Sequence, residues 1–486
     1  MKKRISILFA ILVSISGVSA KIYNIRDYGA KNNKTIVSTS AIQQTIDACA
    51  KDGGGTVVVP AGEYLSATLF LRSNVNFNLE TGATIYASQN KADYEGKSMK
   101  HGAADAQSVN VLIAAFDCEN IKISGKGRLH GQGVREQYTR EAEFDPTELI
   151  TGREIANAAK YGADYRTKYR RVAPSPGLIN LTNCHDVTVE DIQLIESGFW
   201  TFHVQWCSRV FIRGIYITSS SDNGVNSDGL DIDGSSQVLV SDCIIDTGDD
   251  ALCLKTSKNE GKSMSCEDIV ITNCILRSSS AALKIGTESH SDFSRITVSN
   301  CVINGANRGL NMIIRDGGNV SDVHFSNIII KTERKRCFWW GNGDPIWLIV
   351  ANRTPQSKTG SIKNVSFDNI SARSQSGVRL EGYNSAMEDI RFNNVNLYME
   401  PENAIDKRSK HAFHFMNIKN LTLNECSVKW DEQKPEPTWQ KAFNFEKIEN
   451  LYLDKIKANP APDQTEAMSF DQISGEFVHR GYISNK

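Results

Sequence analysis

Apolar and polar residues alternate in short segments that recur along most of the chain. The alternation is clear in HDVTVEDIQL (185–194), SQVLVSDCII (236–245), EDIVITNCIL (267–276), SRITVSNCVI (294–303), KNVSFDNISA (363–372) and KNLTLNECSV (419–428). Within a segment the aliphatic and aromatic residues are two positions apart, which predicts a β-strand with one buried face. Equivalent positions of successive segments are roughly 20–50 residues apart, a period that is typical of solenoids.

Strands that return to equivalent positions predict an all-β fold, a right-handed parallel β-helix whose coils lie ~4.8 Å apart. STSAIQQTIDACAKDGG (38–54) has a helical pattern instead, and we expect it to cap the open N-terminal coil. Cys243, Cys274, Cys301 and Cys426 share one inward repeat position. We therefore interpret the cysteines as a buried apolar ladder, with disulfides as the alternative and no metal-ligand spacing.

Two segments lie outside this pattern. MKKRISILFAILVSISGVSA (1–20) has a basic start, a short apolar run and small residues at its end. It predicts a signal peptide cleaved after Ala20 and a secreted or periplasmic protein, with a membrane anchor as the alternative. Residues 21–486 would then form a single catalytic domain. The charged segment 128–175 lacks the repeat, and we expect a loop over one face, with a short helix within 145–162, or a mere edge cover.

The overall composition excludes several classes of partner. The 486 residues carry 55 Lys and Arg and 56 Asp and Glu, for a net charge of −1. This balance argues against binding to nucleic acid or to an anionic membrane. No run beyond the signal peptide is apolar enough to span a bilayer, and we expect a soluble monomer.

Two clusters of acids depart from this even distribution of charge. They are NSDGLDID (226–233) and DTGDD (246–250). Asp228 and Asp249 are 21 residues apart, close to one coil, so a solenoid would stack them on one face. Crowded carboxylates raise the pKa of one of them and so create a proton donor beside ionised neighbours. Glycoside hydrolysis needs that pair, whereas a calcium site or a structural Asn/Asp ladder are the alternatives.

The same segments resemble a known family. NSDGLDID and DTGDDALCLKT (246–256) are similar to the signature segments of the family 28 glycoside hydrolases, which include polygalacturonases and rhamnogalacturonan hydrolases. Residues 22–64 and GKGRLHGQG (125–133) also resemble that family. The resemblance implies a β-helix, inversion of configuration and neither metal nor cofactor. It implies that Asp249 is the general acid and that Asp228 and Asp250 hold and activate the water.

The substrate-binding motifs depart from the family pattern. Ala281 stands where the family's Gly-His-Gly motif has its histidine, and Asn311 stands where its Arg-x-Lys motif has its arginine. A galacturonate carboxylate calls for cations, so we predict that Lys284 and Arg315 bind the substrate. His290 is a further candidate, with a solvated loop position as the alternative.

Asn226, within the NSDG motif, completes the predicted substrate-binding set. CFWWGNGDPIW (337–347) contains three tryptophans that could stack on sugars or pack on the solenoid, and the same choice applies to Arg170 and Arg171.

We therefore predict an exported hydrolase of pectic polysaccharide that cleaves α-galacturonosyl linkages of galacturonan or rhamnogalacturonan type. The segment 128–175 would favour exo action if it closed one end of the groove. A β-helix polysaccharide lyase, or a non-catalytic carbohydrate-binding solenoid, are the alternatives.

Overall fold

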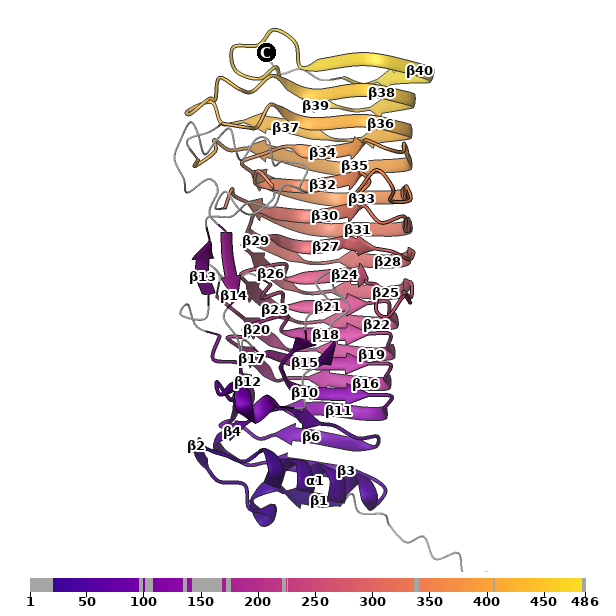
Figure 1. The fold of residues 1–486 in the computed structure, drawn as a ribbon. Helices are drawn as coiled ribbons and strands as arrows, with labels where there is room; N and C mark the ends of the chain where they lie inside the picture. Colours follow the sequence, from indigo (N-terminus) through magenta and orange to yellow (C-terminus); the bar gives the residue numbers. More distant parts are fainter. Residues whose placement is uncertain are drawn as a thin grey trace, which may run out of the picture.

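The computed structural model describes residues 21–95, 99–100, 108–133, 138–141, 168–171, 176–220, 224, 226–335, 341–404 and 407–482. The predicted signal peptide, the predicted helix within 145–162 and Trp339 and Trp340 lie outside the described residues. The described chain forms a tall stack of coils that runs from α1 at one end to β40 at the other (Figure 1).

Most coils of the stack contain three strands, and a strand pairs in parallel with its equivalent in the next coil. For example, β21 (Leu230–Asp233) pairs with β24 (Leu252–Thr256), and β24 pairs with β27 (Ala281–Ser289). The stacked strands make three parallel sheets, here named A, B and C in the order in which a coil visits them. The predicted right-handed parallel β-helix is thereby confirmed.

Sheet A begins at the turns that carry the two acidic motifs, because β21 and β24 follow 226–228 and 246–250. Its strands are β5 (Leu69–Phe70), β10 (Val111–Phe116), β15 (Gly177–Thr182), β18 (Phe202–Gln205), β21, β24, β27, β30 (Arg308–Ile314), β32 (Asp344–Val350) and β34 (Val378–Gly382).

Sheets B and C complete the coil. The strands of sheet B are β1 (Ile22–Asn24), β3 (Gly55–Val59), β6 (Val75–Leu79), β11 (Glu119–Gly125), β16 (His185–Glu190), β19 (Ser208–Arg213), β22 (Ser236–Ser241), β25 (Cys266–Thr272) and β28 (Phe293–Ser299). The strands of sheet C are β2 (Asn33–Val37), β4 (Gly62–Ser66), β7 (Ala83–Ala87), β12 (Arg128–His130), β17 (Gln193–Ile195), β20 (Tyr216–Thr218), β23 (Ile244–Thr247), β26 (Ile275–Ser278), β29 (Val302–Ala306), β37 (Ser427–Trp430) and β39 (Lys457–Ala458).

Toward the C-terminus long strands bend around a corner and join two sheets. Sheets B and C share β31 (Asn319–Thr332), β33 (Ser361–Ser374) and β35 (Met387–Met399), and sheets A and B share β36 (His411–Asn424), β38 (Lys441–Asp454) and β40 (Met468–Arg480).

The asparagines of the repeat explain the corner between sheets B and C. Asn273, Asn300, Asn327, Asn369 and Asn394 all have φ between 52° and 55°. Asparagine tolerates this left-handed conformation better than most residues. The side-chain amides also bond from coil to coil, with Nδ2 of Asn327 donating to Oδ1 of Asn300 at 3.2 Å. The ladder therefore turns the chain and ties neighbouring coils together.

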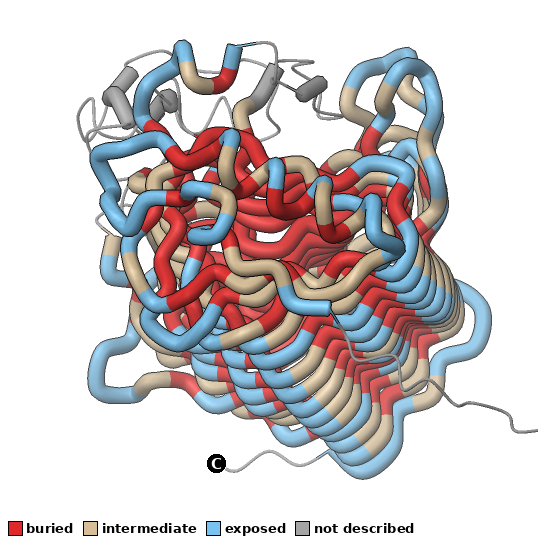
Figure 2. The backbone as a smooth tube through the Cα atoms, turned by 90° about the horizontal axis from the view of Figure 1, so that it is seen from below, coloured by how far each residue is buried: buried red, intermediate tan, exposed pale blue. Residues whose placement is uncertain are grey.

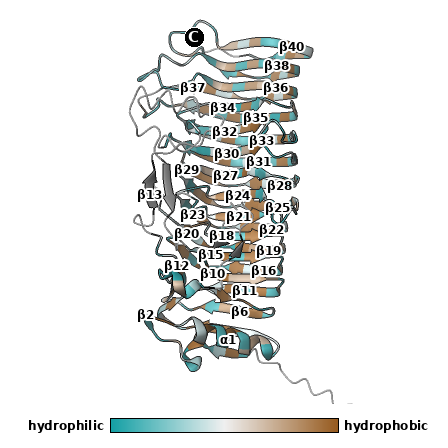
Figure 3. Ribbon diagram, viewed as in Figure 1, coloured by the Kyte–Doolittle hydropathy of each residue, from teal (hydrophilic) through white to brown (hydrophobic). Residues whose placement is uncertain are grey.

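The core is the interior of the coil. Buried residues fill the inside and exposed residues lie on the outer corners (Figure 2), and hydrophobic positions recur on successive strands (Figure 3). Phe325, Phe367 and Phe392 stack with ring centroids 5.1 and 4.7 Å apart. All ten described cysteines are buried and free, including Cys243 and Cys274, which confirms the predicted ladder.

The helix α1 (Thr39–Lys51) covers the N-terminal coil with Ile42, Ile46 and Cys49, so the predicted capping helix is confirmed. Two short 3₁₀ helices, η1 (Ile25–Tyr28) and η2 (Lys91–Tyr94), lie in the same end of the molecule. Among the described residues, no helix has the length and apolar character needed to cross a membrane.

The start of the predicted insertion belongs to a coil. Strand β12 pairs with β7 and β17, so the solenoid continues to His130. Beyond it, β13 (Tyr138–Glu141) and β14 (Lys168–Arg171) form an antiparallel pair. A second such pair joins β8 (Met99–Lys100) and β9 (Ser108–Val109). The remainder of 134–175 lies outside the described residues.

Candidate active site

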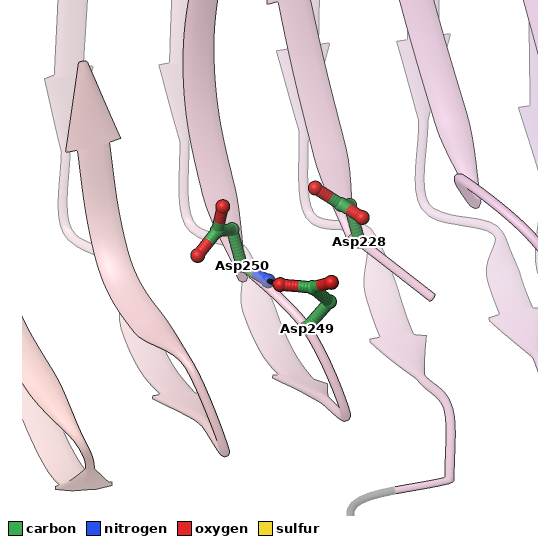
Figure 4. A group of neighbouring side chains, drawn as sticks. All are labelled: Asp228, Asp249 and Asp250. Carbon is green, nitrogen blue, oxygen red and sulfur yellow. Dashed lines mark hydrogen bonds between the residues drawn. The ribbon is translucent and has the colours of Figure 1, made fainter. Parts of the chain in front are cut away.

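Three carboxylates meet where sheet C passes into sheet A. Asp228 and Asp250 each lie two residues before Leu230 and Leu252, which are register partners in β21 and β24. The two acids therefore occupy equivalent positions on neighbouring coils, and Asp249 precedes one of them. One oxygen of each carboxylate lies within 4.8 Å of the others (Figure 4). The structure thus brings the three acids together, as their spacing predicts.

Glycines of the two motifs make this close approach possible. A Cβ atom on Gly248 would lie 2.0 Å from the carbonyl oxygen of Ser220, and one on Gly229 would lie 2.4 Å from that of Ala251. Any side chain at either position would push the coils apart. The two glycines therefore allow Asp249, which follows Gly248, and Asp228, which precedes Gly229, to lie close together.

Asp249 is half-buried and accepts only backbone hydrogen bonds among the described residues. Its Oδ2 atom accepts from the amide of Asn226 at 3.1 Å, and its Oδ1 atom accepts from the amide of Asp250 at 2.9 Å. Burial, followed by the negative charge of Asp250, raises the pKa of Asp249. A carboxyl in this environment retains a proton more readily than an ordinary aspartate.

Asp250 has the opposite environment. Its Oδ2 atom accepts from Nζ of Lys284 at 2.6 Å. Its Oδ1 atom accepts from Oγ of Ser280 at 2.8 Å, from the amide of Ala281 at 3.1 Å and from Nη2 of Arg308 at 3.3 Å. Burial alone would raise the pKa of Asp250, but the charges of Lys284 and Arg308 outweigh it and lower the pKa well below the usual range. Asp250 is therefore held as a carboxylate.

Arg308 is a site residue that sequence reasoning missed. Asp250, Ala281 and Arg308 occupy the same position on three successive coils. Because Ala281 is small, the guanidinium of Arg308 reaches past it to Asp250, and its Nη1 atom also donates to Oδ1 of Asn311 at 3.0 Å. Aligning the coils strand by strand would have placed Arg308 over Ala281, the position where the family motif has its histidine.

Lys255 is a second missed residue, although its segment carries the family resemblance. Its Nζ atom lies 3.7 Å from Asp228, 3.6 Å from Asp231 and 3.5 Å from Glu288, measured to carboxylate oxygens. It also lies 4.4 Å from the ring centroid of Trp200, a cation–π distance. Lys255 follows the inward Leu254, so the alternation of β24 predicts an outward side chain.

Burial, followed by the charge of Asp231, raises the pKa of Asp228. Burial likewise raises the pKa of Asp231, which is fully enclosed. The ammonium of Lys255 opposes both shifts because it favours the ionised carboxylates. Lys255 therefore supplies the positive charge on the Asp228 side of the site, as Lys284 and Arg308 do on the Asp250 side.

Of the four predicted substrate-binding residues, two contact the acid cluster and two contact other residues. Lys284 is buried against Asp250. Asn226 has a φ of 56° and an exposed side chain, and it reaches the acids through its backbone amide. Arg315 is buried just after β30, with Nη2 3.5 Å from the carbonyl oxygen of Arg353. His290 comes directly after β27, with Nε2 4.0 Å from a carboxylate oxygen of Asp316. Their contacts with substrate stay predictions.

Trp347 packs on the outer face of sheet A. Its Nε1 atom donates to Oε2 of Glu381 at 2.8 Å, and the guanidinium carbon of Arg379 lies 4.4 Å from the centroid of its ring. It clusters with Ile313 and Ile349. The tryptophan-rich segment was expected either to stack on sugars or to pack on the solenoid, and Trp347 packs on the solenoid.

The three acids are close enough to share a metal ion, but their surroundings oppose one. Lys255, Lys284 and Arg308 already bring three positive charges to the cluster. Calcium also requires six to eight oxygen ligands, and all four carboxylate oxygens of Asp249 and Asp250 accept hydrogen bonds from backbone amides or cations. The donor set fits a group of acids neutralised by side chains better than a divalent cation.

Comparisons with known proteins agree on a family. The model for glycosyl hydrolases family 28 matches residues 49–413. The exo-poly-alpha-D-galacturonosidase of Dickeya chrysanthemi is 27% identical over 255 residues, which are 48% of this chain and 41% of that protein. The endo-polygalacturonase of Pectobacterium carotovorum subsp. carotovorum is 25% identical over 379 residues, which are 74% of this chain and 84% of that enzyme.

The fold is also shared. The family 28 exopolygalacturonase of Yersinia enterocolitica superposes with a TM-score of 0.62 and 18% identity, over 95% of this chain and 79% of that one. At this identity the likeness concerns the β-helix and not the substrate.

Proposed function

The chain belongs to glycosyl hydrolases family 28, and we propose that it hydrolyses α-galacturonosyl linkages of a pectic polysaccharide. One observation carries the proposal: the surroundings of two adjacent carboxyls shift their pKa values in opposite directions. Asp250 is ionised by two buried cations, whereas Asp249 has a raised pKa. An acid and a base side by side are what the cleavage of a glycosidic bond requires.

In the proposed reaction Asp249 protonates the oxygen of the departing sugar. The attacking water is held between Asp228 and Asp250, whose equivalent positions on neighbouring coils face the same space. Two hydrogen bonds of about 2.8 Å each can bridge oxygens about 5 Å apart. Asp250 accepts the proton of the water, and Lys284 and Arg308 act as positioning residues that keep it ionised.

The stereochemical outcome needs its own test. Inverting enzymes usually separate acid and base by about 6.5–9.5 Å, and retaining enzymes by about 5–5.5 Å. The oxygens of this cluster approach within 4.8 Å, but a water held by Asp228 and Asp250 does not have to fit between Asp249 and its base. We therefore infer inversion. Proton NMR during the first turnover should show the β-anomer as the initial product, and an initial α-anomer would instead establish retention.

The substrate preference can be inferred from the ion pairs that the cations of the site already form. Lys284 and Arg308 are engaged with Asp250, and Asn311 is neutral. Among the described residues, these two cations of sheet A are therefore already paired when a second galacturonate has to be neutralised. We infer that the enzyme prefers a galacturonate joined to a neutral sugar, as in rhamnogalacturonan. The measurement is kcat/KM for rhamnogalacturonan oligosaccharides relative to oligogalacturonides of equal length, and a ratio below one would contradict the inference.

We further propose exo action and export. The names of the relatives include both exo- and endo-acting enzymes, so the size distribution of early products decides between them: monomers or dimers indicate exo action, and a ladder indicates endo action. Unsaturated products absorbing in the near ultraviolet would favour the lyase alternative. Recovery of the full-length protein only from the cytoplasm would contradict export.

A further inference from the structure

A groove of about 1150 Å³ lies on sheet C near the C-terminal end of the solenoid. Its walls are the ends of β31, β33 and β35, together with β37, β39 and the residues that follow β39. We call it the C-terminal groove. The pairing β23–β26–β29–β31 places it three coils beyond the strand that leads to Asp249. At ~4.8 Å per coil it begins about 14 Å along the axis from the acids.

Backbone register sets the order of side chains along the groove. Lys331, Arg373, Tyr398 and Lys429 are partners on four successive strands, so they form one outward column. Lys457 adds a cation from the adjacent column. That column begins with the exposed Ile329 and continues with the small polar residues Ser371, Asn396 and Ser427. The polar part of the surface is thus a strip of cations, hydroxyls, an amide and the ring of Tyr398.

The charges of the strip are not balanced. Arg373 donates from Nε to Glu400 at 2.9 Å, and its guanidinium carbon lies 4.2 Å from the ring centroid of Tyr398. In the described part of the chain, no carboxylate lies within 4.0 Å of the ammonium of Lys331, Lys429 or Lys457.

Glu432 is the acid among the residues that line the groove. Neighbouring like charges repel one another, so an anion that spans several coils would be stabilised here.

We propose that the C-terminal groove binds a second stretch of a galacturonate-containing polysaccharide, away from the acids that cleave it. Such a chain carries carboxylates at intervals along its length, which matches cations that repeat along the solenoid axis. Its hydroxyls suit the serine and asparagine column, and the ring of Tyr398 offers an apolar face to a sugar. The identity of the polyanion rests on the proposed function, but the groove is a separate site.

The test uses the full chain with Asp249→Asn, so that polymer is not degraded during the measurement. Affinity electrophoresis through gels that contain polygalacturonate compares this protein with one that also carries Lys429→Glu and Lys457→Glu. We expect the apparent Kd for polygalacturonate to rise by at least about tenfold. The matched control carries Lys31→Glu and Lys51→Glu, which make the same change of charge on exposed residues at the N-terminal end, and should bind as the parent does.

Equal retardation of the groove variant and its parent would overturn the inference. So would equal retardation of the parent by gels that contain DNA, because the groove would then be a general anion-binding surface. Unchanged thermal unfolding of the groove variant excludes misfolding as the cause of lost binding. Hydrolysis by the unmodified protein is measured separately, so a failure of the proposed activity and a failure of the groove give different results.

Discussion

Replacing Lys284 with Met removes one of the two cations that hold Asp250 ionised and keeps a side chain of similar length. The ammonium lies 2.6 Å from Oδ2 of Asp250, and both side chains are buried. Arg308, 3.3 Å from the other oxygen, is retained. Because the carboxylate then loses part of its stabilisation, the pKa of Asp250 should rise from its lowered position.

The size of the effect follows from the contact. At an effective dielectric constant near 20, unit charges at this separation attract by about 6 kcal/mol. Desolvation of the buried ammonium offsets much of that, and a hydrogen bond to a charged group contributes about 1.5–3 kcal/mol in proteins. One pKa unit corresponds to about 1.36 kcal/mol, so the shift should be about 1–2 units. In its proposed role Asp250 accepts a proton only when it is ionised, so a higher pKa should move the acid limb of the activity profile to higher pH.

The assay is kcat/KM against pH on one oligosaccharide for the wild type, Lys284→Met and Lys284→Arg. Titration of the substrate's own carboxyls is common to all three and cancels in the comparison. The Met variant should show an acid limb about 1–2 pH units above that of the wild type, and the Arg variant should stay close to the wild type. A folded Met variant whose activity is lower at every pH, with an unmoved acid limb, would refute the role given to Lys284.

Asp249→Asn should lower turnover by at least about 10²–10⁴-fold without altering thermal unfolding, because an amide cannot protonate the leaving oxygen; activity within tenfold of the wild type would remove Asp249 from that role. Lys255→Met should cost about 3–5 kcal/mol of unfolding free energy in denaturant titrations by leaving buried carboxylates unpaired, whereas Lys258→Met on the surface should not. EDTA should leave activity intact, and loss restored by calcium would favour the lyase alternative. Phe367→Ala should lower the free energy of unfolding by about 3–5 kcal/mol, because it leaves a cavity in the aromatic stack. Replacing the exposed Lys363 with Ala should change the free energy of unfolding by about 0.5 kcal/mol or less.

The fold could be predicted from the sequence because a solenoid repeats its chemistry with every coil. Alternating apolar positions identify the strands, and asparagines at a recurrent position mark a corner where φ is positive. The same periodicity predicts that Asp228 and Asp249 meet, since their separation is one residue short of a coil. The antiparallel strands within 128–175 were not expected, because that segment has no repeat against which to align it.

The cations of the site were harder to predict than the acids. The outward direction of Lys284 follows from alternation, but its partner does not, since a long flexible side chain can reach a substrate or a neighbouring acid. Arg308 requires the register of three coils and the absence of a large side chain at Ala281. Lys255 stands among acids from three different strands or turns, a grouping that no single segment of sequence displays.

The register of Ala281 connects catalysis with substrate choice. A histidine at this position would lie between Asp250 and Arg308 and would occupy the space through which the guanidinium passes. With alanine, a cation from the next coil is directed onto Asp250, the proposed base, instead of toward the proposed sugar site. Asn311 reinforces this direction, because its side-chain oxygen accepts from the same guanidinium. The departures from the family motifs are therefore coupled: they keep Asp250 ionised with the positive charge that would otherwise face the substrate.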